Sequence, residues 1–167
     1  QGRGVPVNDR EAVKMYRMAA NSGLADAQFS LAGMYASGRG IQQNDKVAAY
    51  WYRKAAEQDD AQAQVTLGTL YDDGRGVEQD YQEAANWYLR AARQGEATAQ
   101  YNLGSLYANG QGVPKDDAQA ANWYRKAAEQ GNATAQYNLG NAYDSGKGVM
   151  QNKEQAARWY KRAAEQG

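Results

Sequence analysis

Histidine and cysteine are both absent from the chain of 167 residues. Without them the protein has no imidazole base, no thiolate nucleophile and no disulfide, and it lacks the ligands that bind most zinc, iron and copper ions. The absence also removes most of the nucleophile and base pairs on which hydrolases depend. We therefore predict that the protein is not an enzyme and has no catalytic residues, no metal site and no cofactor.

Net charge and long apolar runs are missing as well. The 19 basic residues balance the 19 acidic ones, so the whole chain has no excess charge to attract nucleic acid or an anionic membrane. No apolar run approaches the roughly 20 residues that a membrane-spanning helix needs. We expect no nucleic-acid binding and no membrane insertion.

The most prominent feature that is present is a repeat of 36 residues. Its marker is a pair of glycines one residue apart, found at Gly2/Gly4, Gly38/Gly40, Gly74/Gly76, Gly110/Gly112 and Gly146/Gly148. A constant period of this length is typical of repeat arrays. The predicted single domain, 1–167, divides into a partial unit, 1–26, and the repeats 27–62, 63–98, 99–134 and 135–167. We expect this array to be part of a longer protein.

Each repeat is predicted to form two antiparallel helices. In the first helix Ala, Leu and Tyr recur at i, i+4 and i+8, as at Ala135, Leu139 and Tyr143, which places them on one face. A glycine such as Gly146 then supplies the left-handed residue that ends the helix. The second helix begins at an N-cap, and these caps are Asn8, Asn44, Asp80, Asp116 and Asn152. The glycine pair is thus a turn between helices, and the phosphate-loop alternative is disfavoured because no strand precedes it.

The second helix carries alanines, tryptophans and tyrosines on its apolar face and basic residues elsewhere. The periodic spacing of Trp51, Trp87, Trp123 and Trp159 favours packing over a stacking platform for bases or sugars. Glu57, Glu129 and Glu165 lie one turn beyond Arg53, Arg125 and Lys161. This spacing favours ion pairs within the helix over a basic surface for nucleic acid.

The pattern AQYNLG..Y..G.GV at residues 135–149, and A..WYRKAAEQG at residues 120–131, resemble the Sel1-like repeat, a relative of the tetratricopeptide repeat. The resemblance covers essentially the whole chain. It implies an all-α fold, a right-handed α-solenoid (superhelix) of antiparallel helix pairs with nine helices in this chain. It also implies a non-catalytic scaffold or adaptor that binds a protein or peptide partner.

Relatives in this family suggest two alternatives and a location. The first alternative is a bacterial periplasmic immunity or inhibitor protein that sequesters a secreted effector. The second is the β-lactam binding or weak hydrolase activity linked to cysteine-rich relatives, which the lack of cysteine here disfavours. The resemblance favours an extracytoplasmic location, in the periplasm or secreted.

By analogy with the tetratricopeptide groove, the concave face is made by the first helix of each pair. The candidate partner-binding residues lie off its Ala/Leu/Tyr stripe: Phe29, Thr69, Asp72, Asp73, Tyr101, Asn102, Ser105, Asn109, Tyr137, Asn138, Asn141 and Asp144. No Lys or Arg occurs at the positions assigned to this groove, so we expect a neutral or basic polypeptide segment. Tyr101 and Tyr137 would anchor it, and asparagine amides would bind its backbone. The alternative that these are only solvated helix residues stays open.

The two ends of the array should expose surface that neighbours cover elsewhere. The first complete helix has no partner before it, so some of Met15, Tyr16, Met18 and Ala19 should lack cover. Repeat arrays normally need polar caps at both ends. A longer parent protein, a partner or end-to-end self-association could cover these surfaces.

Overall fold

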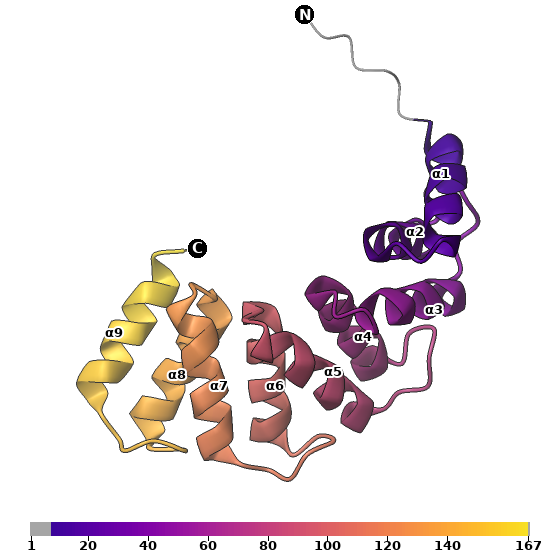
Figure 1. Ribbon diagram of the computed structural model, residues 1–167. Coiled ribbons are helices and arrows are strands. Elements are labelled where there is room, and N and C mark those ends of the chain that lie inside the picture. The colour runs from indigo at the N-terminus through magenta and orange to yellow at the C-terminus, as the bar shows by residue number, and fades with distance from the viewer. Residues whose placement is uncertain (1–7, 167) are drawn as a thin grey trace, which may run out of the picture. The chain divides into compact units, whose positions relative to one another are not determined.

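The computed structural model describes residues 8–166, which contain nine α-helices and no β-strand (Figure 1). The helices are α1 (Asp9–Asn21), α2 (Ala25–Ser37), α3 (Asp45–Ala56), α4 (Ala61–Asp73), α5 (Tyr81–Arg93), α6 (Ala97–Asn109), α7 (Asp117–Glu129), α8 (Ala133–Ser145) and α9 (Lys153–Ala164). The predicted all-α fold with nine helices is confirmed. The first glycine pair, Gly2/Gly4, lies outside the described residues.

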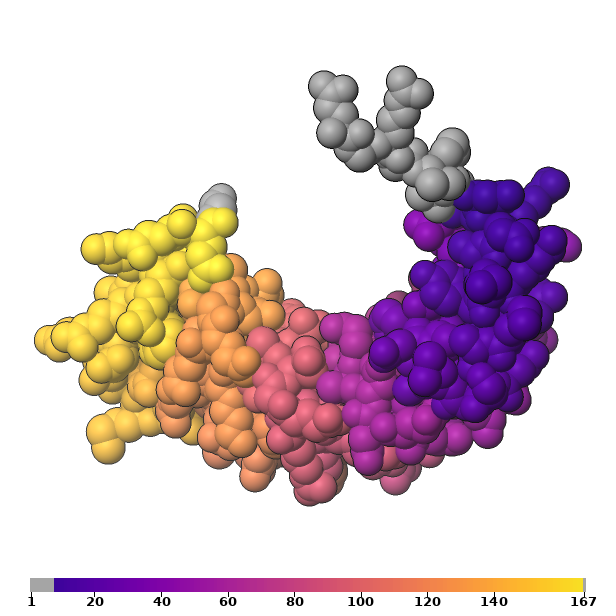
Figure 2. Space-filling view, turned by 45° about the horizontal axis from the view of Figure 1, so that its top comes forward, coloured from indigo at the N-terminus to yellow at the C-terminus, as the bar shows by residue number. Residues whose placement is uncertain are grey.

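The chain divides into two compact units, Gln1–Gln79 and Asp80–Gly167. The described part of the first unit contains α1 to α4, and the second contains α5 to α9. Within each unit every helix packs against the next one along the chain. In the second unit the atoms of consecutive helices are in contact from pink through orange to yellow (Figure 2).

The helices begin and end where the sequence predicts. Asn8, Asn44, Asp80, Asp116 and Asn152 each accept a backbone hydrogen bond in the first turn of their helix. The glycines that follow α2, α4, α6 and α8 all have left-handed backbone angles. Side-chain caps and glycine stops therefore determine the element boundaries locally, before any tertiary contact forms.

In the four pairs that the structure describes, the second glycine has a further role, which is close contact with another helix. Its φ is positive, as at Gly148 (φ 70°), and a Cβ there would collide with the backbone carbonyl of Asp117 in the first turn of α7. In the first unit the residue between the two glycines also reaches the preceding repeat. Arg39 Nε lies 3.1 Å from Asp9 Oδ1, and Arg75 Nε lies 3.7 Å from Asp45 Oδ1. The turn of one repeat thus contacts the repeat before it.

Leucines and alanines fill the contacts between helices. Leu31, Leu67, Leu103 and Leu139 are fully buried. Small alanines let the helices approach closely, and Tyr52, Tyr88 and Tyr124 fill the wider gaps. The tryptophans belong to this packing, as predicted, and cations lie over their rings: Arg90 is 4.7 Å from the Trp87 centroid and Lys126 is 4.1 Å from that of Trp123.

A column of buried glutamines, which the sequence analysis missed, ties consecutive helices together. Gln100 Nε2 donates to the Ala92 carbonyl at 3.2 Å, and Gln100 Oε1 accepts from Gln130 Nε2 at 2.9 Å. The corresponding residues are Gln28, Gln64 and Gln136, and all are buried. Buried amides need such partners because an unpaired polar group costs stability. The recurrence of glutamine in every repeat was the signal that could have identified it.

The exposure expected at the start of the array is confirmed. Met15 and Met18 are 62% and 71% exposed, and Tyr16 is also exposed. Ala19 is half-buried.

Replacement of Gly148 by alanine tests the contact between repeats. Gly148→Ala should lower the free energy of unfolding by about 2–4 kcal/mol, because a left-handed backbone and a steric clash act together. The matched control is Gly131→Ala, which also has positive φ but has nothing within 4 Å of a built Cβ. It should cost only about 1 kcal/mol. Urea unfolding followed by circular dichroism measures both, and equal losses would contradict the clash.

Candidate functional site

The predicted partner-binding residues of the second unit lie together on α6 and α8. They are Tyr101, Asn102, Ser105, Asn109, Tyr137, Asn138, Asn141 and Asp144. None of them is fully buried, whereas Leu103, Leu106 and Leu139, which lie between them, are in the core. We call these residues the α6/α8 face.

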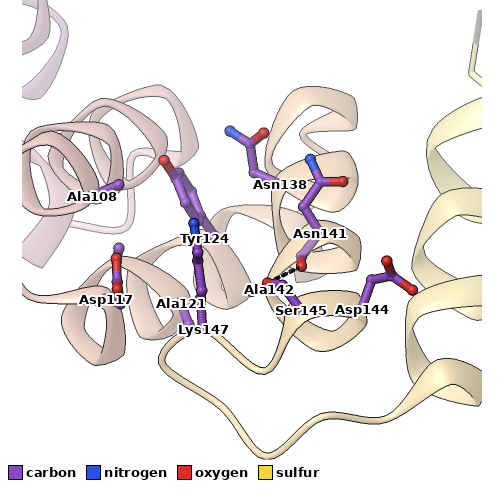
Figure 3. A pocket seen from close by; sticks show the side chains of 11 residues that line it. Ala108, Asp117, Ala121, Tyr124, Asn138, Asn141, Ala142, Asp144, Ser145 and Lys147 are labelled. Carbon is purple, nitrogen blue, oxygen red and sulfur yellow. Dashed lines mark hydrogen bonds between the residues drawn. The ribbon is translucent and has the colours of Figure 1, made fainter.

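A pocket of about 400 Å³ opens beside this face, between α7 and α8. Its wall includes Asn138, Asn141 and Asp144 from α8, Asp117 and Tyr124 from α7, and Lys147 from the following turn (Figure 3). The Asn138 and Asn141 side chains leave α8 toward the same side (Figure 3). The sequence analysis did not assign Asp117, Tyr124 or Lys147 to a site, because they come from the second helix and from the turn.

Tyr124 joins the core to the α6/α8 face. Its ring packs so close to Gly104 of α6 that a Cβ there would lie 2.9 Å from the ring. Its hydroxyl is hydrogen-bonded to the Ser105 and Asn138 side chains. Burial raises the pKa of Tyr124, the neighbouring Tyr101 raises it further, and the two hydrogen bonds partly oppose the increase. Tyr124 therefore orients polar groups on two helices.

Tyr160 of α9 likewise has a hydroxyl that is hydrogen-bonded to a polar side chain of the preceding helix, in this case Asn141. Its hydroxyl donates to Asn141 Oδ1 at 2.7 Å, which leaves the Asn141 amide nitrogen as a donor. The Tyr137 ring lies 5.6 Å from the Tyr160 ring, and Tyr137 is 55% exposed. Tyr137 thus presents an exposed aromatic ring that packs against Tyr160 on one side.

The charged residues near the α6/α8 face include two lysines. Lys153 Nζ lies 2.8 Å from Asp144 Oδ1 and also donates to the Asp144 carbonyl at 3.0 Å. Lys147 lines the pocket. The sequence analysis counted only positions on the first helices, so it missed both lysines. The preference for a neutral or basic segment stays a prediction, but Asp144 gives little support to a basic one.

The remaining candidates belong to the first unit. Phe29 is half-buried, and its ring centroid lies 5.3 Å from that of Tyr52 in an edge-on arrangement. The Thr69 hydroxyl donates to the Val65 carbonyl at 3.2 Å. Asp72 is half-buried and Asp73 is exposed. Phe29 and Thr69 therefore have local structural roles in the first unit.

Three arginines of the second helices join consecutive repeats. Arg17 donates to the Tyr35 hydroxyl at 3.1 Å and Arg125 to the Tyr143 hydroxyl at 3.2 Å, and Arg53 bonds Tyr71 in the same way. Of the three predicted pairs with glutamate, Lys161 and Glu165 form one, at 3.9 Å.

Residues 8–166 contain no group of three or more acidic side chains arranged to hold a metal ion. No helix among them is long and apolar enough to cross a bilayer.

A family model described as the Sel1 repeat matches the chain five times, at residues 1–24, 25–60, 61–96, 97–132 and 133–167. The chain belongs to the Sel1 repeat family. The matched repeats begin two residues before the boundaries chosen from the sequence. Sel1 repeats typically mediate protein–protein interactions and are generally non-catalytic.

Solved Sel1 structures share the fold. One is c5321, a protective antigen of uropathogenic Escherichia coli, with 40% identity, a TM-score of 0.96, and coverage of 99% of this chain and 36% of that one. A Sel1 repeat protein from Oxalobacter formigenes has 40% identity and a TM-score of 0.94, with coverage of 98% and 68%. This chain thus spans about a third of the E. coli protein.

A more distant structure shows similarity of fold alone. It is the immunity protein Pa5087 from Pseudomonas aeruginosa, with 20% identity, a TM-score of 0.52, and coverage of 96% of this chain and 75% of that one. Among curated proteins, no sequence matches the chain.

The raised pKa of Tyr124 predicts a loss of stability at alkaline pH. In the unfolded chain this tyrosine ionises near its ordinary pKa of about 10, and in the folded protein it ionises at higher pH. Its contribution to stability is therefore complete below about pH 10 and is lost as the pH rises through the folded pKa. Tyr124→Phe should show a smaller loss than wild type in urea unfolding at pH 8 and 10.5.

The control for this experiment is Tyr50→Phe, since Tyr50 is exposed. It should retain the wild-type dependence on pH. Equal pH dependence in wild type and Tyr124→Phe would contradict the role assigned to this hydroxyl.

Proposed function

We propose that the protein is a non-catalytic interaction module and that its α6/α8 face binds an extended polypeptide segment. The observation that supports this most strongly is the pair Asn138 and Asn141, whose side chains are held by tyrosine hydroxyls beside an open pocket. The proposal agrees with the general role of Sel1 repeats in protein–protein contacts.

The asparagine amides suit the backbone of a peptide. An extended backbone presents both N–H and C=O groups, and an asparagine side chain can donate to one and accept from the other. Asn138 and Asn141 are three residues apart on α8, so they lie on one face of the helix. Because Tyr124 and Tyr160 already restrain these side chains, binding would cost less conformational entropy.

Tyr137 is the aromatic anchor of the proposed site. A large exposed aromatic side chain packed against a neighbour loses little rotamer freedom on binding, and such residues are common among interface hot spots. Tyr101 is half-buried against Tyr124, with the ring centroids 6.0 Å apart. It would contribute less new contact area than Tyr137.

The local charges favour a segment of low net charge. Lys153 pairs with Asp144, and the pocket wall has both an acidic residue, Asp117, and a basic one, Lys147. Neither sign dominates near the two asparagines. A polar, nearly neutral segment therefore fits this site better than a strongly basic one.

The chemistry of the face supports binding without catalysis. Burial raises the pKa of Tyr124 and of Tyr160, so both hydroxyls stay protonated near neutral pH. A protonated phenol is a hydrogen-bond donor and is a poor base or nucleophile.

The proposal can be tested with peptides selected from a phage-displayed random library on the wild-type protein. The double variant Asn138→Ala/Asn141→Ala should bind a selected peptide about 10 to 100 times more weakly, because two hydrogen bonds are lost. Tyr137→Ala should also weaken binding at least about tenfold. Calorimetry measures the affinities, and circular dichroism checks that each variant is folded.

The matched control is Asn86→Ala/Asn122→Ala. These asparagines are exposed on the second helices α5 and α7, so their removal should leave the affinity unchanged. Full affinity in the Asn138→Ala/Asn141→Ala variant, or failure to select any peptide, would refute binding at the α6/α8 face.

A further inference from the structure

Asp117 and Lys147, which line the pocket beside the α6/α8 face, occupy positions that recur in the chain. Asp117 is the first residue of α7. Lys147 lies between the two glycines of the turn after α8, and the second of these glycines, Gly148, packs against the Asp117 carbonyl. The corresponding turns of the first unit pack in the same way against Asp9 and Asp45. The three acidic residues are therefore equivalent members of the repeat.

In the first unit this acidic residue is paired with an arginine from the turn. Arg39 contacts Asp9 and Arg75 contacts Asp45, and in both pairs the arginine atom is Nε. A lysine has the methylene carbon Cε in the place of Nε, so it has no donor at that point of its side chain. The repeat therefore forms this ion pair through arginine, and lysine is not an equivalent substitute.

In the fourth repeat both charges are present but they are not joined. Within residues 8–166 no ion pair or side-chain hydrogen bond connects Asp117 to Lys147 or to another residue. In Figure 3 the Lys147 amine stands apart from the Asp117 carboxylate, although both belong to the same pocket. Asp117 is half-buried and Lys147 is exposed. The pocket thus offers one negative and one positive group to a guest.

Much of the remaining pocket wall is apolar. It includes Ala108, Ala120, Ala121 and Ala142, and the Tyr124 side chain. An arginine side chain suits such a wall, because its methylene stem packs on apolar surface while its guanidinium group pairs with a carboxylate.

We propose that the segment bound at the α6/α8 face places an arginine against Asp117 and an acidic side chain against Lys147. This inference rests on the proposed function and specifies its guest. The arginine takes the place that Arg39 and Arg75 fill in the first unit. The two opposite charges keep the segment nearly neutral, which matches the balanced charges of the pocket. Alternate side chains of an extended chain point to the same side, so the two charged residues are two positions apart.

The experiment uses peptides selected from a phage-displayed random library on the full wild-type chain. Selected peptides should be enriched in an arginine two positions from an aspartate or glutamate. Asp117→Asn should weaken the binding of such a peptide about three- to tenfold, because one charged pair is lost. Replacement of the peptide's arginine by glutamine should have the same effect. The two changes together should cost no more than either one alone, since they remove the same contact.

The same cycle applies to Lys147→Gln and to a peptide whose acidic residue is replaced by the corresponding amide. The matched controls are Glu129→Gln and Lys126→Gln, which remove exposed charges of α7 outside the pocket. Both should leave the affinity unchanged. Calorimetry measures the affinities, and circular dichroism checks that each variant is folded.

Lys147→Arg separates a specific pair from general attraction, because it keeps the charge of the pocket. The new side chain should reach Asp117 through its Nε, as Arg39 reaches Asp9 in the first unit. It should then occupy the carboxylate and weaken the arginine peptide about three- to tenfold. Unchanged affinity for this variant would overturn the inference.

The remaining outcomes separate this inference from the proposed function. Selected peptides without the charge pair, or full affinity for Asp117→Asn, would overturn the assignment of the guest. If those peptides still lose affinity for Asn138→Ala/Asn141→Ala, the peptide site on the α6/α8 face stands. Failure to select any peptide would refute both the site and its guest.

Discussion

The packing of a tyrosine ring against a glycine of the preceding helix is the contact on which the candidate site of the second unit depends. A Cβ at Gly140 would lie 2.6 Å from the Tyr160 ring, and Gly104 has the same relation to Tyr124. Because these positions have no side chain, each ring reaches through the helix pair and brings its hydroxyl to the surface. There the hydroxyl holds the asparagine or serine that a partner would meet.

Within α8, the residues that stabilise the fold are different from those that we propose bind a partner. Ala, Leu and the buried glutamine of α8 face the core and recur in each repeat. Tyr137, Asn138 and Asn141 lie on the remaining surface, where the residues differ between repeats. Substitutions there can change the partner without altering the packing, which is a general advantage of repeat proteins.

The repeat also reproduces the same packing surface on successive second helices. The side of a second helix that meets the next repeat is apolar, with a few hydrogen-bonding groups at set positions. Where the next helix is present, as with α8 on α7, this surface is core. The same apolar positions and the same buried glutamine recur in each repeat, so the contacts between consecutive helices within a unit follow one pattern.

The elements of the fold could be predicted from the sequence because their signals are local. The caps at Asn152 and Asp116, and the glycine that ends α8, act within one helical turn, and the Ala/Leu/Tyr spacing identifies the buried face without knowledge of any neighbour. The 36-residue period then implies that equal hairpins stack. The sequence alone therefore determined the helices, their boundaries and the apolar residues of the core.

The polar details could not be derived in this way, because they depend on distances between groups far apart in the sequence. Lys153 reaches Asp144 from the next helix, and Arg125 reaches Tyr143 across a repeat boundary. The tyrosine hydroxyls emerge beside Asn138 and Asn141 only after α7 and α9 have packed on α8. Only the tertiary structure decided which polar groups pair and which remain available to a partner, since hydrogen bonds and ion pairs require contact at about 3 Å.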